Sequence, residues 1–378
     1  MQCGVCDMTT IAVIGLGTMG LGIAQTYAAA GFAVLATDAV PEARETALGR
    51  LRAGLAPRVR AGKLAQADLD AILARITVVD GPKAMGATDL AIEAVVERMP
   101  VKQSLFAALE AVVAPDAVLA SNTSSLSMAA MAEGLARPER LLGLHFFNPA
   151  PVMKLVELVA HPGTGAAALD RARRLTEAAG KTVIPCPDRP GFIVNRCARP
   201  FYGEALAMLE EGRSAAEIDA AMQAAGYPLG PFGLIDLVGA DINLAATESL
   251  AAAMEGHPRY HVFDALRRQV ASGDLGRKTG RGFLYPDEPG PAPKDAKAIA
   301  RRIEAALVNE AGWLLAEGGT TQQGIDTALK LGLNFPRGPF EVLAAQGHER
   351  VLARLDHLAA AAPAHLDGRY QPAPVLTR

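Results

Sequence analysis

The first half of the chain alternates between short, mostly apolar runs and helical patterns. Runs of this length are typical of parallel strands buried on both faces, and they occupy residues 10–14, 33–36, 89–95, 117–120, 141–144 and 153–159. The segments between them, of which 41–74 is the longest, place apolar residues at helical spacing. This alternation predicts an α/β domain with a mainly parallel sheet over residues 8–188.

Residues 180–190 contain a further strand-like run followed by proline punctuation, and helical periodicity replaces the alternation after them. We expect helices over residues 191–211, 215–225, 231–255 and 262–272. A polar, proline-rich linker follows at residues 286–295. The sequence therefore predicts two all-α domains, the first over residues 189–287 and the second over residues 295–378.

The second helical domain repeats parts of the first. LAEG at 315–318, ID at 325–326 and NFPRGPF at 334–340 correspond to LEEG at 209–212, ID at 218–219 and GYPLGPF at 226–232. The second copy keeps the helix stops and the PxGPF turn, but it has no counterpart of the FIVNR segment at 192–196. We interpret it as a packing module that covers apolar surface of the first copy.

A GxGxxG loop follows the first strand-like run and opens a helical pattern, the context in which this motif indicates a dinucleotide site. Gly15 permits a tight turn, Gly17 lets the backbone approach a pyrophosphate, and Gly20 lets the helix pack closely on the strand. Asp38 ends the second run and favours NAD over NADP, because it can accept hydrogen bonds from the ribose hydroxyls. The loop residues expected at the cofactor, with the helix amino terminus facing the phosphates, are Gly15, Leu16, Gly17, Thr18, Met19 and Gly20.

Candidate acid–base residues flank a proline turn. His145 closes the run at 141–144, and Glu157 lies in the next run, both equally far from Pro151. If the two runs fold back on one another, the carboxylate can orient the imidazole while the other ring nitrogen takes a proton from a substrate hydroxyl. Ser124, in the polar SNTSSL segment after the run at 117–120, could hold the hydroxyl oxygen. A single histidine at the end of a strand is more often structural. The prediction of a catalytic role therefore depends on His145, Glu157 and Ser124 occurring together.

Composition and charge limit the classes of function. The net charge of −3 gives no overall attraction to nucleic acid or to an anionic membrane, and half of the 378 residues are hydrophobic, enough for sizeable cores. No apolar run approaches the ~20 residues of a membrane span, and the first residues lack a signal-peptide pattern, so we expect a cytoplasmic protein. Cys3 and Cys6 form a CxxC without further ligands nearby, which predicts no metal site.

Three motifs in this order and spacing closely resemble the 3-hydroxyacyl-CoA dehydrogenase family: SNTSSL at 121–126, HFFNPAPVMKLVE at 145–157 and PGFIVNR at 190–196. The resemblance covers residues 10–285, with a further partial copy beyond. It implies a Rossmann-type domain followed by tandem helical domains like the C-terminal domain of 6-phosphogluconate dehydrogenase. It also implies oxidation of an L-3-hydroxyacyl-CoA to the 3-oxoacyl-CoA with NAD as the hydride acceptor.

The resemblance assigns roles that patterns alone leave open. It makes His145 the base and Glu157 its orienting carboxylate, with Ser124 and Asn195 positioning the substrate oxygen. Because Asn195 belongs to another domain than His145, closure of the domains is expected to complete the site. Four further residues are implied in the cofactor site: Glu97, Lys102, Asn122 and Lys278.

A basic window at residues 50–63 contains no acidic residue. An ordinary solvated helical face would explain it, whereas the resemblance implies that it meets the phosphates of coenzyme A, with Arg58 and Lys63 as candidates. The substrate stays open between 3-hydroxybutyryl-CoA and 3-hydroxyadipyl-CoA, in β-oxidation or aromatic-acid catabolism. ARPFY at 198–202, together with the tandem helical domains, resembles the 3-hydroxyadipyl-CoA dehydrogenases. A dicarboxylate substrate would need a cation near its acyl end, which Arg196 or Arg199 of this chain could provide, although arginines are also common on helix surfaces.

Two other classes of function remain open. One is a dehydrogenase of a hydroxy compound without coenzyme A, and the other is a non-catalytic dinucleotide-binding or structural relative. The assembly also stays open between a homodimer and a monomer in which the tandem helical domains form an intrachain pseudo-dimer.

Overall fold

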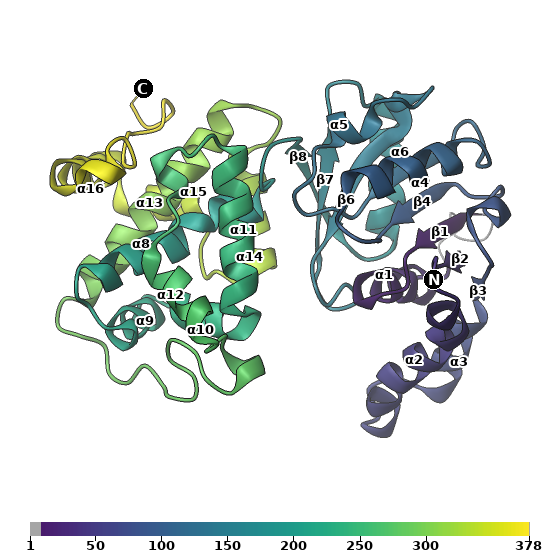
Figure 1. Cartoon of the computed structure of the whole chain (residues 1–378), viewed down its shortest axis with the longest axis horizontal. Helices are drawn as coiled ribbons and strands as arrows, with labels where there is room; N and C mark the ends of the chain where they lie inside the picture. Colours follow the sequence, from purple (N-terminus) through teal and green to yellow (C-terminus); the bar gives the residue numbers. More distant parts are fainter. Residues whose placement is uncertain (1–8, 378) are drawn as a thin grey trace. The chain divides into compact units, whose positions relative to one another are not determined.

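The computed structural model describes residues 9–377, which divide into two compact units between Arg189 and Pro190 (Figure 1). The first unit alternates strands with helices, and the second is helical. This confirms the predicted order of an α/β domain followed by helical domains. Cys3 and Cys6 lie outside the described residues. Within residues 9–377, no helix has both the length and the apolar character needed to cross a membrane.

The first unit is built on one eight-stranded sheet with the order β3-β2-β1-β4-β5-β6-β7-β8. Neighbouring strands are parallel, except for the antiparallel pair β6 and β7. The short strand β3 was not predicted from the sequence. The strands are β1 (Thr10–Ile14), β2 (Ala33–Thr37), β3 (Ile76–Val78), β4 (Leu90–Glu93), β5 (Val118–Ser121), β6 (Leu141–Phe146), β7 (Leu155–Ala160) and β8 (Thr182–Pro187).

Helices cover both faces of this sheet. On one face, α1 and α6 share a core with the strands, and Tyr27 of α1 is hydrogen-bonded to Thr176 of α6 at 2.9 Å. On the other, α5 packs so closely that a Cβ at Gly143 of β6 would lie 3.3 Å from Sδ of Met128. Figure 1 shows α2 and α3 side by side, extending from the sheet. The helices are α1 (Thr18–Ala29), α2 (Pro41–Arg60), α3 (Gln66–Ala74), α4 (Met99–Glu110), α5 (Met128–Ala132) and α6 (Ala166–Ala178).

The second unit contains the two helical copies. The first comprises α7 (Val194–Cys197), α8 (Arg199–Glu210), α9 (Ala215–Ala224), α10 (Pro231–Val238), α11 (Ala240–Ala253) and α12 (Asp264–Ser272). The second comprises α13 (Ala296–Ala316), α14 (Gln322–Leu333), α15 (Pro339–Gln346) and α16 (His348–Ala361).

Two of the long helices predicted from the sequence are broken in the structure. The helix expected over 191–211 is divided into α7 and α8, with Pro200 in the first turn of α8, where a missing N–H costs no helical hydrogen bond. The helix expected over 231–255 is divided at Gly239, whose φ of 110° is incompatible with a right-handed helix. The predictions of continuous helices were therefore wrong.

The repeated sequence motifs preserve one structural device. Asp219 of α9 accepts two backbone N–H bonds from the first turn of α10, at 2.9 and 2.7 Å. Asp326 of α14 does the same at the start of α15, at 2.8 and 3.1 Å. A Cβ at Gly230 or at Gly338 would lie 2.3 Å from the respective aspartate side chain. Both copies therefore keep an aspartate cap and a glycine that makes room for it.

Candidate active site

Strand register places the candidate residues along one edge of the sheet, the edge formed by the carboxyl ends of its parallel strands. Ile14 pairs with Thr37 on one side and Glu93 on the other, and the row continues through Ser121 to Gly143. The carboxyl ends of β2, β1, β4 and β5 therefore lie side by side, and β6 continues beyond them to Phe146. In sheets of this kind, ligands bind just beyond that edge. The glycine loop, Asp38, the SNTSSL segment and His145 all lie at or beyond this row.

The glycine loop fits a dinucleotide. Gly15 has a φ of 100°, and a Cβ there would lie 2.4 Å from the carbonyl oxygen of Ala94. A Cβ at Gly20 would lie 1.7 Å from the carbonyl oxygen of Gly15, whereas one at Gly17 would meet nothing within 4 Å. Gly15 and Gly20 are thus required by the fold, and Gly17 leaves open space at the amino terminus of α1. Backbone N–H groups there can bind a pyrophosphate.

Asp38 holds the glycine loop from the end of β2. Its Oδ2 accepts a hydrogen bond from Leu16 N–H at 2.6 Å, and its Oδ1 accepts one from Val40 N–H at 2.9 Å. Each carboxylate oxygen can accept a further hydrogen bond, so these contacts are compatible with the predicted ribose hydroxyls. The contact of Asp38 with the cofactor itself stays a prediction.

Lys102 is buried against two carboxylates. Its Nζ lies 2.6 Å from Oε1 of Glu93 and 3.1 Å from Oε2 of Glu97, and its side chain is only 1% exposed. Glu93 also accepts a hydrogen bond from the hydroxyl of Ser121 at 2.7 Å. This cluster ties the ends of β4 and β5 to α4. Sequence analysis did not single out Glu93, although a carboxylate inside the apolar run at 89–95 was a signal that it has a buried partner.

Glu97 joins this cluster to the SNTSSL segment. Its Oε1 accepts hydrogen bonds from the hydroxyl of Thr123, the N–H of Ser124 at 3.2 Å and the hydroxyl of Ser125 at 3.2 Å. Burial would raise the pKa of Glu97, but the Thr123 hydrogen bond and the Lys102 ammonium outweigh it, so the pKa is lowered. The Glu97 carboxylate is therefore ionised at neutral pH and fixes the backbone that carries Ser124.

Ser124 and Asn122 follow β5 at the same edge. The half-buried Ser124 hydroxyl makes no hydrogen bond within the part of the chain that the structure describes, which leaves it able to bind a ligand. Asn122 Oδ1 accepts the backbone N–H of Phe146 at 2.9 Å and so joins the ends of β5 and β6. Asn122 therefore has a structural contact besides its predicted role at the cofactor.

His145 and Glu157 lie directly opposite each other in the antiparallel pair β6 and β7, which confirms that the two runs fold back on one another. His145 Nδ1–H donates to Oε2 of the buried Glu157 at 2.6 Å. With the proton on Nδ1, Nε2 is the ring nitrogen that can take a proton. The ring of Phe147 lies 4.5 Å from the imidazole, centroid to centroid. This is the geometry of an oriented general base, and the catalytic role itself stays a prediction.

Two candidates belong to the second unit, and their contacts with substrate and cofactor stay predictions. Asn195 is half-buried in α7, and its carbonyl accepts a hydrogen bond from Nε of Arg199 at 3.0 Å. Lys278 Nζ lies 2.5 and 2.6 Å from the two carboxylate oxygens of Asp241.

Arg196 is completely buried and paired with carboxylates. It therefore cannot provide the cation expected for a dicarboxylate substrate.

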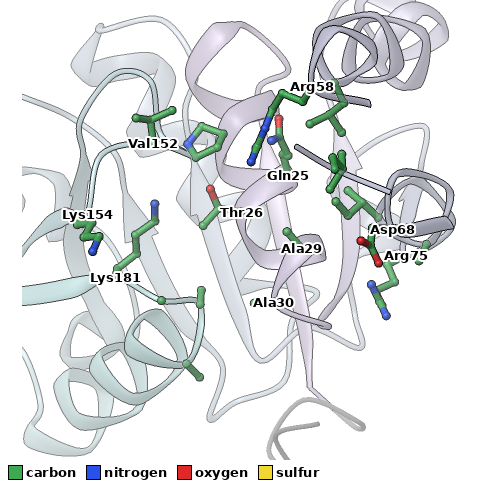
Figure 2. A pocket seen from close by; sticks show the side chains of 18 residues that line it. Gln25, Thr26, Ala29, Ala30, Arg58, Asp68, Arg75, Val152, Lys154 and Lys181 are labelled. Atoms are coloured by element: carbon green, nitrogen blue, oxygen red, sulfur yellow. The ribbon is translucent and has the colours of Figure 1, made fainter. Parts of the chain in front are cut away.

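A cavity of about 740 Å³ lies between α1, the α2–α3 pair and the turn that joins β6 to β7 (Figure 2). Asp68 is its single carboxylate, against four cationic side chains: Arg58, Arg75, Lys154 and Lys181. Figure 2 shows Arg58 near Gln25 of α1. Lys63, the other candidate for coenzyme A, does not line the cavity.

The cations of this cavity differ in what they already bind. Lys181 Nζ donates to the carbonyl oxygens of Ala150 and Met153 at 2.5 and 2.8 Å, and burial lowers its pKa. Arg58, by contrast, forms no ion pair within the described residues. The cavity can therefore attract an anion through Arg58, while Lys181 stabilises its wall.

Family models match both units. The model described as 3-hydroxyacyl-CoA dehydrogenase, NAD binding domain, matches residues 10–189. The model described as 3-hydroxyacyl-CoA dehydrogenase, C-terminal domain, matches residues 191–285 and again residues 299–378. These two matches correspond to the two helical copies recognised from the internal repeat.

Known proteins are similar over most of the chain. The 3-hydroxyadipyl-CoA dehydrogenase of Escherichia coli (strain K12) is 35% identical, covering 93% of this chain and 94% of that protein. The probable 3-hydroxybutyryl-CoA dehydrogenase of Bacillus subtilis (strain 168) is 39% identical, covering 75% of this chain and 99% of that protein. The crystal structure of 3-hydroxybutyryl-CoA dehydrogenase from Escherichia coli K12 has a TM-score of 0.90 and 34% identity, covering 98% of both chains.

The glycine loop gives a test that separates folding from cofactor binding. Gly17→Ala should keep the melting temperature of the parent protein, because its Cβ meets open space, but should weaken NAD binding about tenfold or more by obstructing the pyrophosphate. Gly20→Ala should lower the melting temperature, because its Cβ would overlap the Gly15 carbonyl. Thermal unfolding and NAD titration measure the two effects. Unchanged NAD affinity in Gly17→Ala would contradict the predicted phosphate site.

Proposed function

The chain belongs to the 3-hydroxyacyl-CoA dehydrogenase family, and we propose how its own residues carry out the reaction. It is an NAD-dependent enzyme that oxidises an L-3-hydroxyacyl-CoA to the 3-oxoacyl-CoA. The observation on which the mechanism rests is the 2.6 Å hydrogen bond from His145 to the buried carboxylate of Glu157, at the edge of the sheet that also carries the glycine loop.

His145 acts as the general base of this mechanism. Its Nε2 takes the proton of the substrate's C3 hydroxyl, and the Glu157 carboxylate stabilises the imidazolium that results. Bound NAD supplies the acceptor for the hydride that leaves carbon 3. The Ser124 hydroxyl and the Asn195 amide hold the substrate oxygen as it changes from alcohol to carbonyl. A positioned base contributes about 10²–10⁴-fold to the rate.

His145→Ala should lower kcat by about 10²–10⁴-fold while NAD still binds. Formation of NADH is followed with 3-hydroxybutyryl-CoA and, separately, with 3-hydroxyadipyl-CoA. His161→Ala is the matched control, because His161 is equally buried but hydrogen-bonds the carbonyl of Pro138 and the N–H of Gly163. It should change stability and leave kcat unaffected.

In the parent protein, the ratio of the rates of NADH formation with 3-hydroxybutyryl-CoA and with 3-hydroxyadipyl-CoA would identify the preferred acyl group. Both substrates remain in the proposal, because similar proteins carry both names. Absence of NADH with either substrate, in a protein that binds NAD, would contradict the acyl-CoA assignment. It would favour a hydroxy compound without coenzyme A or a non-catalytic relative.

The cavity beside α1 is the proposed site for the phosphates of coenzyme A. Its cationic side chains outnumber its single carboxylate, Asp68, and phosphate groups bind arginine through charge-assisted hydrogen bonds. Pro151 and Val152, from the turn after His145, line the same cavity. A substrate held there by its nucleotide would therefore lie next to the segment that carries the base. Arg58 is the residue of the basic window that we assign to this contact.

Arg58→Ala should raise KM for 3-hydroxybutyryl-CoA about tenfold with little change in kcat, because it removes binding that is equal in ground and transition states. Lys63→Ala, outside the cavity, should change KM little. The same acyl group on pantetheine, which lacks the nucleotide, provides a second control, since Arg58→Ala should not affect its KM. An equal rise in KM for both thioesters would show that Arg58 does not act on the nucleotide.

The assembly that the contacts favour is a monomer with an intrachain pseudo-dimer. Helix α13 of the second copy packs against α8 and α9 of the first. Phe335 of the second copy lies 4.9 Å from Phe201 and 5.1 Å from Tyr227, its counterpart in the first copy, between ring centroids. The second copy thus covers apolar surface that a partner chain would otherwise cover. Sedimentation velocity should give the mass of one chain, and a stable dimer would contradict this proposal.

A further inference from the structure

Buried ion pairs join the two helical copies. They form two clusters, each centred on one arginine that binds two glutamates of the other copy, and we call these clusters clamps. In the first clamp, Arg196 of the first copy binds two carboxylates of the second. Its Nε lies 2.7 Å from Glu310, and its terminal nitrogens lie 2.9 and 2.6 Å from the two oxygens of Glu317. Glu310 is buried and also accepts hydrogen bonds from the hydroxyl of Tyr260 at 2.5 Å and from Nε of Arg259 at 3.0 Å.

The second clamp has the same chemistry with the copies exchanged. Arg302 of the second copy binds Glu204 through Nε at 2.9 Å and the two oxygens of Glu211 at 2.6 and 2.8 Å. Glu204 is buried and accepts further hydrogen bonds from Tyr370 at 3.0 Å and Arg369 at 2.8 Å. The central arginine and both glutamates of each clamp lie 106 positions from their counterparts. The clamps are therefore related by the internal repeat. This alignment pairs residues 298–302 (AIARR) with FIVNR at 192–196, so the expectation that the second copy lacks a counterpart of this segment was wrong for Arg196, which Arg302 matches, and holds for Asn195.

The two clamps hold different kinds of structure. Arg302 lies within α13, a continuous helix of 21 residues. Arg196 lies in α7, which has four residues and follows two residues in the left-handed region, Gly191 with φ 75° and Phe192 with φ 50°. So short a helix has little stability of its own. Its position therefore depends on tertiary contacts, and α7 packs against α13 and α14 of the second copy.

We propose that Arg196 is a positioning residue, and that the second copy holds α7 through this arginine so that the Asn195 amide meets the substrate oxygen. This inference rests on the substrate role proposed for Asn195. Arg199 Nε holds the Asn195 carbonyl at 3.0 Å and binds Thr247 of the first copy at 3.0 Å. The first copy therefore fixes α7 at Asn195, and the second fixes it at Arg196.

The second copy is, on this view, part of the catalytic apparatus as well as a packing module. In the second clamp, the position that corresponds to Asn195 is occupied by Arg301, to which the proposed mechanism assigns no role. The second clamp therefore contributes to stability alone, and the internal repeat provides its own control.

Glu310→Gln and Glu204→Gln test this asymmetry. Each variant removes the charge of a buried carboxylate that accepts from two arginines and a tyrosine, so both should lower the melting temperature to a similar extent. Glu310→Gln should also lower kcat about tenfold, with NAD affinity unchanged, because misplacement of a positioned group slows the chemical step. Glu204→Gln should leave kcat within about twofold of the parent value. Equal losses of kcat in the two variants would overturn the proposal.

An Asn195→Ala background separates this inference from the function on which it rests. If Glu310 acts through Asn195, the Glu310→Gln change should lower kcat no further in that background. If kcat is unchanged in Asn195→Ala alone, the proposed role of Asn195 is refuted. If Asn195→Ala lowers kcat and Glu310→Gln lowers it further by the same factor as in the parent protein, only the role of the clamp is refuted. If the buried variants do not fold, Glu317→Gln and Glu211→Gln give the same comparison at side chains that are 31% and 54% exposed.

Discussion

The hydrogen bond between His145 and Glu157 depends on one reversal of strand direction in an otherwise parallel sheet. Directly opposed residues of an antiparallel pair have Cβ atoms roughly 5 Å apart, so a short hairpin brings the base and its carboxylate together without help from distant segments. A slip of one residue would turn Glu157 to the other face of the sheet. Lys181 secures the turn by binding the carbonyls of Ala150 and Met153, so a buried cation supports the register on which the chemistry rests.

The surrounding edge is held by a buried ion pair, Lys102 with Glu93, to which the more exposed Glu97 is joined. Lys102 between Glu93 and Glu97 fixes the segments after β4 and β5, and the lowered pKa of Glu97 keeps its carboxylate ionised while it binds the Ser124 backbone. Leaving one member of such a cluster unpaired would cost about 3–5 kcal/mol. Rigid placement of the loops and stability of the sheet therefore have the same physical origin.

Local patterns were sufficient to predict much of this structure. The glycine loop, the apolar runs and the symmetry of His145 and Glu157 about Pro151 all concern residues close together in sequence, where geometry follows from periodicity. The partners of Lys102 and Arg196 could not be predicted, because nothing local marks which distant carboxylate a buried cation will meet. The break at Gly239 was missed because the apolar spacing continues across it, while its positive φ depends on the packing of α10 and α11.

If His145 and Glu157 act as one catalytic unit, their effects on kcat should not be additive, and a double-mutant cycle measures this. His145→Gln should slow turnover by about 10²–10⁴-fold, and Glu157→Gln should also slow it. The double variant should be no slower than His145→Gln alone, because an absent base cannot be oriented. Losses of kcat that multiply in the double variant would show instead that the two residues act independently, and that Glu157 does not work through His145.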